Sequence, residues 1–238
     1  MTTDTTSDDI ASVRERLNEK IKNVAGSDWC HRIELDEASE FLPAENLKYR
    51  LTVLRQVFGS LFKNQTVLVL NESSGLYPVM IKRAGAASVT ANNLSQDRCE
   101  VMSELASFTG DSFDILNQSL ALFDGSQIFV DFDYEESHNF LFAQNLIWSL
   151  YNAAGQSFPD VVEACAHYVT DGLVFDWNNA EWATPPPPED YNRENFHSVL
   201  RERFEYVLAC NDWLTIALGK LPTAEVPGMN GESENDQV

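Results

Sequence analysis

Apolar residues recur at three- and four-residue spacing in two segments near the start of the chain. The first segment carries Ile10, Val13, Leu17, Ile21 and Val24, and the second carries Leu47, Leu51, Leu54, Phe58 and Leu61. This spacing puts the apolar side chains on one face of a helix, so it predicts two amphipathic helices. Between them, the stretch DWCHRIEL (residues 28–35) is aromatic and predicted to be extended.

From Thr66 onward, short apolar runs alternate with segments of helical spacing. The predicted strands are 66–70, 87–91, QIFVDFD (127–133), NFLFAQN (139–145) and GLVFDW (172–177). The predicted helices are 76–84, 96–108, 158–168 and one that Asp111 caps, with Phe113, Leu116, Leu120 and Phe123 on one face. Repeated strand–helix units with nearly continuous apolar strands predict a parallel sheet that helices cover on both faces.

The last part of the chain follows a different pattern. Residues 192–203 have helical spacing, and the apolar runs YVLAC (206–210) and WLTIAL (213–218) then flank Asn211 and Asp212. Two such runs around a short polar connection predict a tight antiparallel hairpin.

This order of elements resembles the class I S-adenosylmethionine-dependent methyltransferases over about residues 29–221. The resemblance rests on VLVLNESSGLYPVMIKRAGAASVTANNLS, NFLFAQNLIWSL, GLVFDW, DYNRENF and the final hairpin, taken in sequence. It implies an α/β fold with a Rossmann-like, seven-stranded, mostly parallel sheet that ends in an antiparallel hairpin. The chain then divides into a disordered tail (1–9), an N-terminal helical cover over the cofactor mouth (10–62), the methyltransferase-like α/β domain (63–221) and a disordered acidic tail (222–238).

The cofactor motifs depart from the pattern of that family. The first motif reads acid-x-Gly-x-Gly-x-Gly, and here Val69 stands at the acid position while Asn71, Ser73 and Gly75 stand at the glycine positions. The position of the carboxylate that receives the ribose hydroxyls carries Asn93, which pairs with hydroxyls but lacks the strength of a charge. The resemblance therefore implies that S-adenosylmethionine is bound weakly or has been lost, with Asn71, Ser73, Gly75, Asn93, Asp133 and Gln144 as the cofactor-binding residues.

Each of these residues also has a structural interpretation. Gly75 is compatible with a tight turn that binds nothing, and Asp131 and Asp133 with solvated acids at a strand end. The acidic stretch DFDYEES (131–137) matches no EF-hand spacing, so we expect no metal there.

Candidates for catalysis should lie at the carboxyl ends of the parallel strands, where open α/β sheets bind ligands. The sequence indicates His31, Asn145 and Trp148, and more broadly Tyr77, His138, Gln144 and residues 176–178. His31 is either a general base or a hydrogen-bonded structural histidine, and Trp148 either stacks on the substrate or belongs to the core or a lid.

Charge and composition narrow the range of partners. The chain has 16 Lys and Arg against 37 Asp and Glu, a net charge of −21. Such a chain is repelled by nucleic acid and by anionic membranes, so we expect neither as a partner. We find no signal-peptide pattern and no run of about 20 apolar residues, which predicts a cytoplasmic protein. The four cysteines are scattered, which favours ordinary buried thiols over a metal site or disulfides.

These observations leave three hypotheses for function. The first is an S-adenosylmethionine-dependent methyltransferase that acts on a small molecule through weakened cofactor motifs. The alternative is a catalytically inactive methyltransferase-like protein, a pseudoenzyme that serves as a binding or scaffolding subunit for a protein partner or as a homodimer. A third keeps the pocket for a different ligand. The segment from Pro185 to Pro188 is either a lid edge or a docking stretch.

Overall fold

The computed structural model describes residues 7–25, 33–35, 41–43, 45–70, 74–117, 136–143, 147–177, 180 and 183–221. Within these residues the chain forms a seven-stranded sheet in the order β5-β4-β3-β6-β7-β9-β8, and a separate two-stranded sheet. The strands of the large sheet are β3 (Thr66–Leu70), β4 (Ser88–Asn92), β5 (Asp114–Leu116), β6 (His138–Ala143), β7 (Val169–Asp176), β8 (Phe204–Ala209) and β9 (Leu214–Lys220).

The first five strands of this sheet are parallel, and β9 is antiparallel to both of its neighbours, β7 and β8. Strands β1 (Ile33–Leu35) and β2 (Phe41–Pro43) form the small antiparallel sheet, which the sequence pattern did not predict. The helices are α1 (Ser7–Ala25), α2 (Glu45–Leu61), α3 (Leu76–Arg83), α4 (Gln96–Thr109), α5 (Ile147–Ala153), α6 (Phe158–His167) and α7 (Arg193–Arg203).

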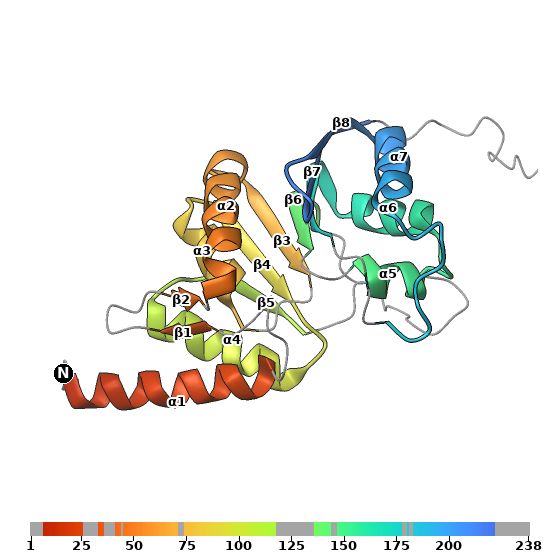
Figure 1. Cartoon of the computed structure of the whole chain (residues 1–238). Coiled ribbons are helices and arrows are strands. Elements are labelled where there is room, and N and C mark those ends of the chain that lie inside the picture. The colour runs from red at the N-terminus through yellow and green to blue at the C-terminus, as the bar shows by residue number, and fades with distance from the viewer. Residues whose placement is uncertain are drawn as a thin grey trace, which may run out of the picture.

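Helices lie on both faces of the large sheet, with α2 and α3 on one side and α5, α6 and α7 on the other (Figure 1). The two faces arise from the two-residue alternation of the strands. In β3, Val67 and Val69 belong to the apolar cluster beneath α2 and α3, whereas Leu68 and Leu70 belong to the cluster beneath α5, α6 and α7. The continuous apolar run of this strand therefore fills two cores at once.

The predicted fold class is confirmed, including the antiparallel hairpin at the end of the chain. The helix predicted after Asp111 is wrong, because residues 114–116 form β5 and pair with β4. The Asp111 side chain accepts a hydrogen bond from Arg83 Nε at 2.9 Å instead of capping a helix. A three-residue strand is too short to show alternation, and Phe113 and Leu116 fit helical spacing equally well. The predicted strand QIFVDFD lies outside the described residues.

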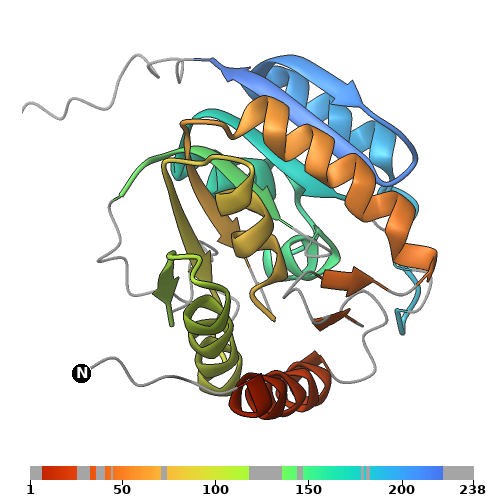
Figure 2. The ribbon, with the colours of Figure 1, turned by 90° about the vertical axis from the view of Figure 1, so that its left-hand side faces the viewer.

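The two N-terminal helices occupy different places. Helix α1 packs against α4 and lies toward the end of the molecule to which β3 and β4 point, which is the carboxyl edge (Figures 1 and 2). It begins at Ser7, so residues 7–9 are helical although we assigned them to the tail. Helix α2 packs on one face of the sheet, where its Leu54 and Phe58 are buried, so its predicted role as a cover over the cofactor mouth stays a prediction.

Among the described residues, none of the helices has the length and apolar character that a membrane crossing requires.

Candidate cofactor-binding edge

The turn between β3 and α3 keeps one feature of a nucleotide-binding turn, the left-handed glycine at the start of the helix. Gly75 has φ 86° and precedes α3, where its carbonyl accepts the Val79 N–H. The Ser74 hydroxyl accepts a hydrogen bond from Leu76 N at 3.5 Å. The N–H groups at the start of a helix can bind an anionic or polar ligand group, and α3 has no acidic side chain in its first turn that would compete for them.

Gly75 also has a packing role that is independent of any ligand. A Cβ atom at this position would lie 2.9 Å from Leu105 Cδ2 and 3.4 Å from Met102 Cα, both on α4. The residue is therefore glycine for two reasons, a left-handed backbone and a close approach between helices. Val69, at the acid position of the motif, is fully buried in the core beneath α2 and α3.

The ribose position, Asn93, lies directly after β4 and is 3% exposed. Its Oδ1 accepts a hydrogen bond from Ser95 N at 2.8 Å, which turns the chain into α4. Its backbone is tied to the end of β5, because Asn93 N donates to Leu116 O at 3.1 Å and Asn117 Nδ2 donates to Asn93 O at 3.0 Å. Neutral amides thus order the loop that would hold a cofactor's ribose.

Leu94 is a feature of this edge that the sequence analysis missed. It is 64% exposed, although leucine is usually buried, and it sits between Asn93 and Ser95, the N-cap of α4. An apolar residue in a polar strand–helix turn is the signal that would have found it. The described residues therefore offer three features that suit a nucleoside: a helix N-terminus, an amide for hydroxyl groups and an apolar surface for a base. The carboxylate that binds the ribose in the family pattern is replaced by the amide of Asn93.

The candidate Trp148 lies in an aromatic cluster on the opposite face of the sheet from α2. It is 8% exposed and meets Tyr191 edge-on with ring centroids 4.8 Å apart, and it stacks on Tyr151 at 6.0 Å. Burial favours the packing interpretation of this residue. Tyr77 is also a core residue, since it packs on Phe142 with ring centroids 5.2 Å apart.

Two other candidates lie at opposite edges of the sheet. His138 opens β6 and is therefore at the amino edge, so its placement at the ligand-binding edge is wrong. Burial lowers the pKa of His138. Asp176 closes β7 at the carboxyl edge, where the direction of the parallel strands predicts ligand-binding residues.

Asp176 forms a buried ion pair with Arg50 of α2, at 2.6 Å between Oδ1 and Nη2. The guanidinium of Arg50 also lies over the Trp213 ring, 4.4 Å from its centroid. Burial raises the pKa of the Asp176 carboxyl to about 7, while the Arg50 charge acts in the opposite direction. Because the two partners are 126 positions apart, no local pattern in the sequence could have indicated the pair.

The remaining predicted site residues lie outside the described part of the chain, so their roles stay predictions. They are His31, Asn71, Ser73, Asp133, Gln144 and Asn145.

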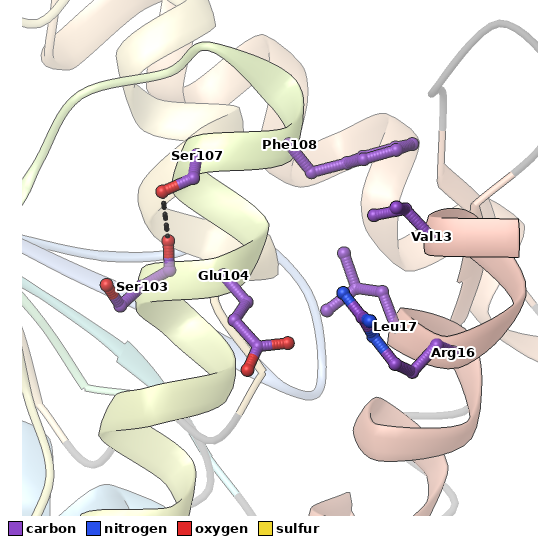
Figure 3. A pocket seen from close by; sticks show the side chains of 7 residues that line it. All are labelled: Val13, Arg16, Leu17, Ser103, Glu104, Ser107 and Phe108. Carbon is purple, nitrogen blue, oxygen red and sulfur yellow. Dashed lines mark hydrogen bonds between the residues drawn. The ribbon is translucent and has the colours of Figure 1, made fainter. Parts of the chain in front are cut away.

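A cleft of about 320 Å³ lies between α1 and α4, and none of the residues that line it is a predicted cofactor-binding residue (Figure 3). Val13, Leu17 and Phe108 give it apolar walls. Two of its polar side chains are engaged, because Glu104 pairs with Lys20 and the Ser107 hydroxyl donates to Ser103 O at 2.9 Å. The cleft therefore lies along the contact between α1 and α4.

Comparison with solved structures agrees with the fold described above. The chain is similar to magnesium protoporphyrin IX methyltransferase (ChlM) from Synechocystis PCC 6803 with bound SAM, with a TM-score of 0.52, 11% identity and coverage of 92% of this chain and 100% of that one. It is also similar to N-methyltransferase NodS from Bradyrhizobium japonicum WM9, with a TM-score of 0.51, 10% identity and coverage of 76% and 100%. No family model and no curated protein sequence matches the chain.

The sheet order, the final hairpin and these similarities define the fold of the protein. The chain has the class I S-adenosylmethionine-dependent methyltransferase fold. At these identities the fold is shared while the cofactor and the acceptor are not thereby assigned.

Proposed function

We propose that the protein is an S-adenosylmethionine-dependent methyltransferase that acts on a small molecule and binds its cofactor weakly. The observation that carries the proposal is the pair of Asn93, buried at the end of β4, and Gly75, left-handed at the start of α3. They follow neighbouring parallel strands, so both lie at the carboxyl edge where this fold holds its cofactor.

The cofactor supplies a methyl group activated on its sulfonium, and the protein's own residues position it. The Asn93 amide would pair with ribose hydroxyls, the α3 N-terminus would take the amino-acid portion, and Leu94 would support the base. The neutral amide makes these contacts weaker than a carboxylate would, by about 1 kcal/mol or more.

A small acceptor is favoured over a macromolecule by two observations. The net charge of −21 opposes binding to nucleic acid. In addition, α1 packs against α4 near the carboxyl edge, where a covering element limits the size of what can enter.

The test is calorimetric titration of the full chain with S-adenosylmethionine and S-adenosylhomocysteine, on wild type and on Asn93→Asp. The aspartate keeps the acceptor for Ser95 N and adds the missing charge, so the affinity should rise by about fivefold to tenfold.

The matched control is Ser95→Asp, which adds the same charge in the same turn while remaining a good N-cap for α4. An equal gain in both variants would refute the ribose assignment of Asn93. If neither wild type nor a folded Asn93→Asp protein binds the cofactor at millimolar concentration, the proposed function is wrong. The scaffolding alternative, which the buried Val69 favours, would then replace it.

A further inference from the structure

One margin of the large sheet has no covering strand among the described residues. Strand β8 ends the sheet order and pairs only with β9 among the described residues, and it forms the outer margin of the molecule (Figures 1 and 2). Tyr206 and Leu208, on the same face of this strand, are 56% and 49% exposed. Exposed apolar side chains on a free edge offer both backbone hydrogen bonds and apolar area to another strand.

The strand at the opposite margin, β5, has features that discourage pairing with a strand of another molecule. Strand β5 is only three residues long and begins with the exposed Asp114. Strand β8 is six residues long, FEYVLA, and contains no proline, lysine or glycine. Its one charged side chain is Glu205, so the usual devices that block edge pairing are missing from Tyr206 onward.

The backbone direction of β8 can be read from the hairpin. Cys210 N donates to Leu214 O at 3.0 Å, so Cys210 faces β9. In an antiparallel ladder successive residues face opposite sides, which directs the N–H and C=O groups of Val207 and Ala209 toward the free edge.

We propose that β8 pairs antiparallel with β8 of a second copy of this chain, about a twofold axis at Val207. Val207 then pairs with Val207 of the second copy, and Ala209 pairs with its Glu205. Tyr206 lies opposite Leu208 of the second copy, and Leu208 opposite its Tyr206, so the exposed apolar side chains cover one another. The pattern is complementary to itself, as an isologous interface requires.

The charges around β8 are balanced, so they do not oppose the approach of a second copy, although the whole chain has a net charge of −21. The segment 201–220 contains three basic and three acidic residues, namely Arg201, Glu202, Arg203, Glu205, Asp212 and Lys220. Repulsion therefore comes from the rest of the molecule at longer range, where salt screens it. We expect dimerisation to strengthen as salt is added, in contrast to an interface that depends on opposite charges.

The first test is sedimentation velocity or light scattering on the full chain over a wide concentration range. Wild type should shift with concentration from 26.8 kDa toward twice that mass. The double variant Tyr206→Glu/Leu208→Glu should stay at the monomer mass. The matched control is Tyr49→Glu, which changes a tyrosine 66% exposed on α2 and should dimerise like wild type.

The second test fixes the register by oxidative cross-linking in a Cys30→Ser/Cys210→Ser background, because Cys210 is the exposed thiol among the described cysteines and Cys30 lies outside the described residues. Val207→Cys should give a cross-linked dimer, whereas Glu205→Cys should not, because Ala209 of the second copy lies opposite it. A wild type that stays monomeric at all concentrations, or a dimer that the double variant leaves intact, would overturn the proposal. Neither test depends on methyl transfer.

Discussion

The buried ion pair between Arg50 of α2 and Asp176 of β7 should contribute substantially to the free energy of unfolding. The substitution Arg50→Met tests this. The side chains of the pair are 18% and 5% exposed, and they lie 2.6 Å apart. Methionine keeps the apolar stem but removes the charge, which leaves the carboxylate buried without its cation. Loss of one partner from such a pair costs about 3–5 kcal/mol of unfolding free energy.

The loss should depend on pH in a defined direction. The folded-state pKa of Asp176, about 7, lies above the unfolded value of 3.8. The folded state therefore binds the extra proton across this window, and the contribution of Asp176 to stability falls as the pH rises through it. Arg50→Met removes the charge that lowers this pKa. The loss of unfolding free energy in this variant should therefore be largest at about pH 8, where Asp176 is ionised, and small near about pH 5, where it is protonated.

The assay is urea unfolding at both pH values, with Arg83→Met as the control. Arg83 and Asp111 form a more exposed pair, with side chains 32% and 18% exposed and atoms 2.9 Å apart. Its removal should cost less than about 1 kcal/mol at either pH. Adding Asp176→Asn to Arg50→Met should recover part of the loss. Equal costs for the two Arg→Met variants, or an Arg50→Met cost that does not change with pH, would refute the reasoning.

Gly75→Ala should lower the free energy of unfolding by at least about 1 kcal/mol, since it combines φ 86° with a Cβ contact of 2.9 Å to Leu105. Gly59→Ala, in α2 with no atom within 4 Å, should instead stabilise, and urea unfolding that gives both variants the same sign would contradict this. His197 is hydrogen-bonded to Thr215 at 2.8 Å, and burial lowers its pKa to about 4. The stability that the neutral His197 gives the folded state is therefore present above the unfolded pKa of 6.5 and is lost as the pH falls toward the folded value. His197→Gln should flatten this part of the stability–pH curve, and an unchanged slope would show that another group is responsible.

Much of the architecture could be read from the sequence because it depends on local periodicity. The β3 strand is an apolar run of five residues, and α6 repeats apolar residues on one face, so each element carries its own signal. The β8–β9 hairpin could be predicted because Asn211 and Asp212 separate two apolar runs. In the structure the Asn211 side chain accepts hydrogen bonds from Trp213 N and Leu214 N, which stabilises this turn. The order of these elements along the chain was sufficient to indicate the fold.

Sequence alone also determined which residue types stand at the cofactor positions, including the valine and the asparagine where the family pattern has acids. It could not determine what those side chains contact. Only the tertiary structure turns the Asn93 amide onto Ser95, places Gly75 against α4 and brings Arg50 to Asp176 across 126 positions. It also decides which apolar residues remain exposed, as Leu94 and Tyr206 do, because exposure depends on the neighbours that the whole fold supplies and not on the residue's own type.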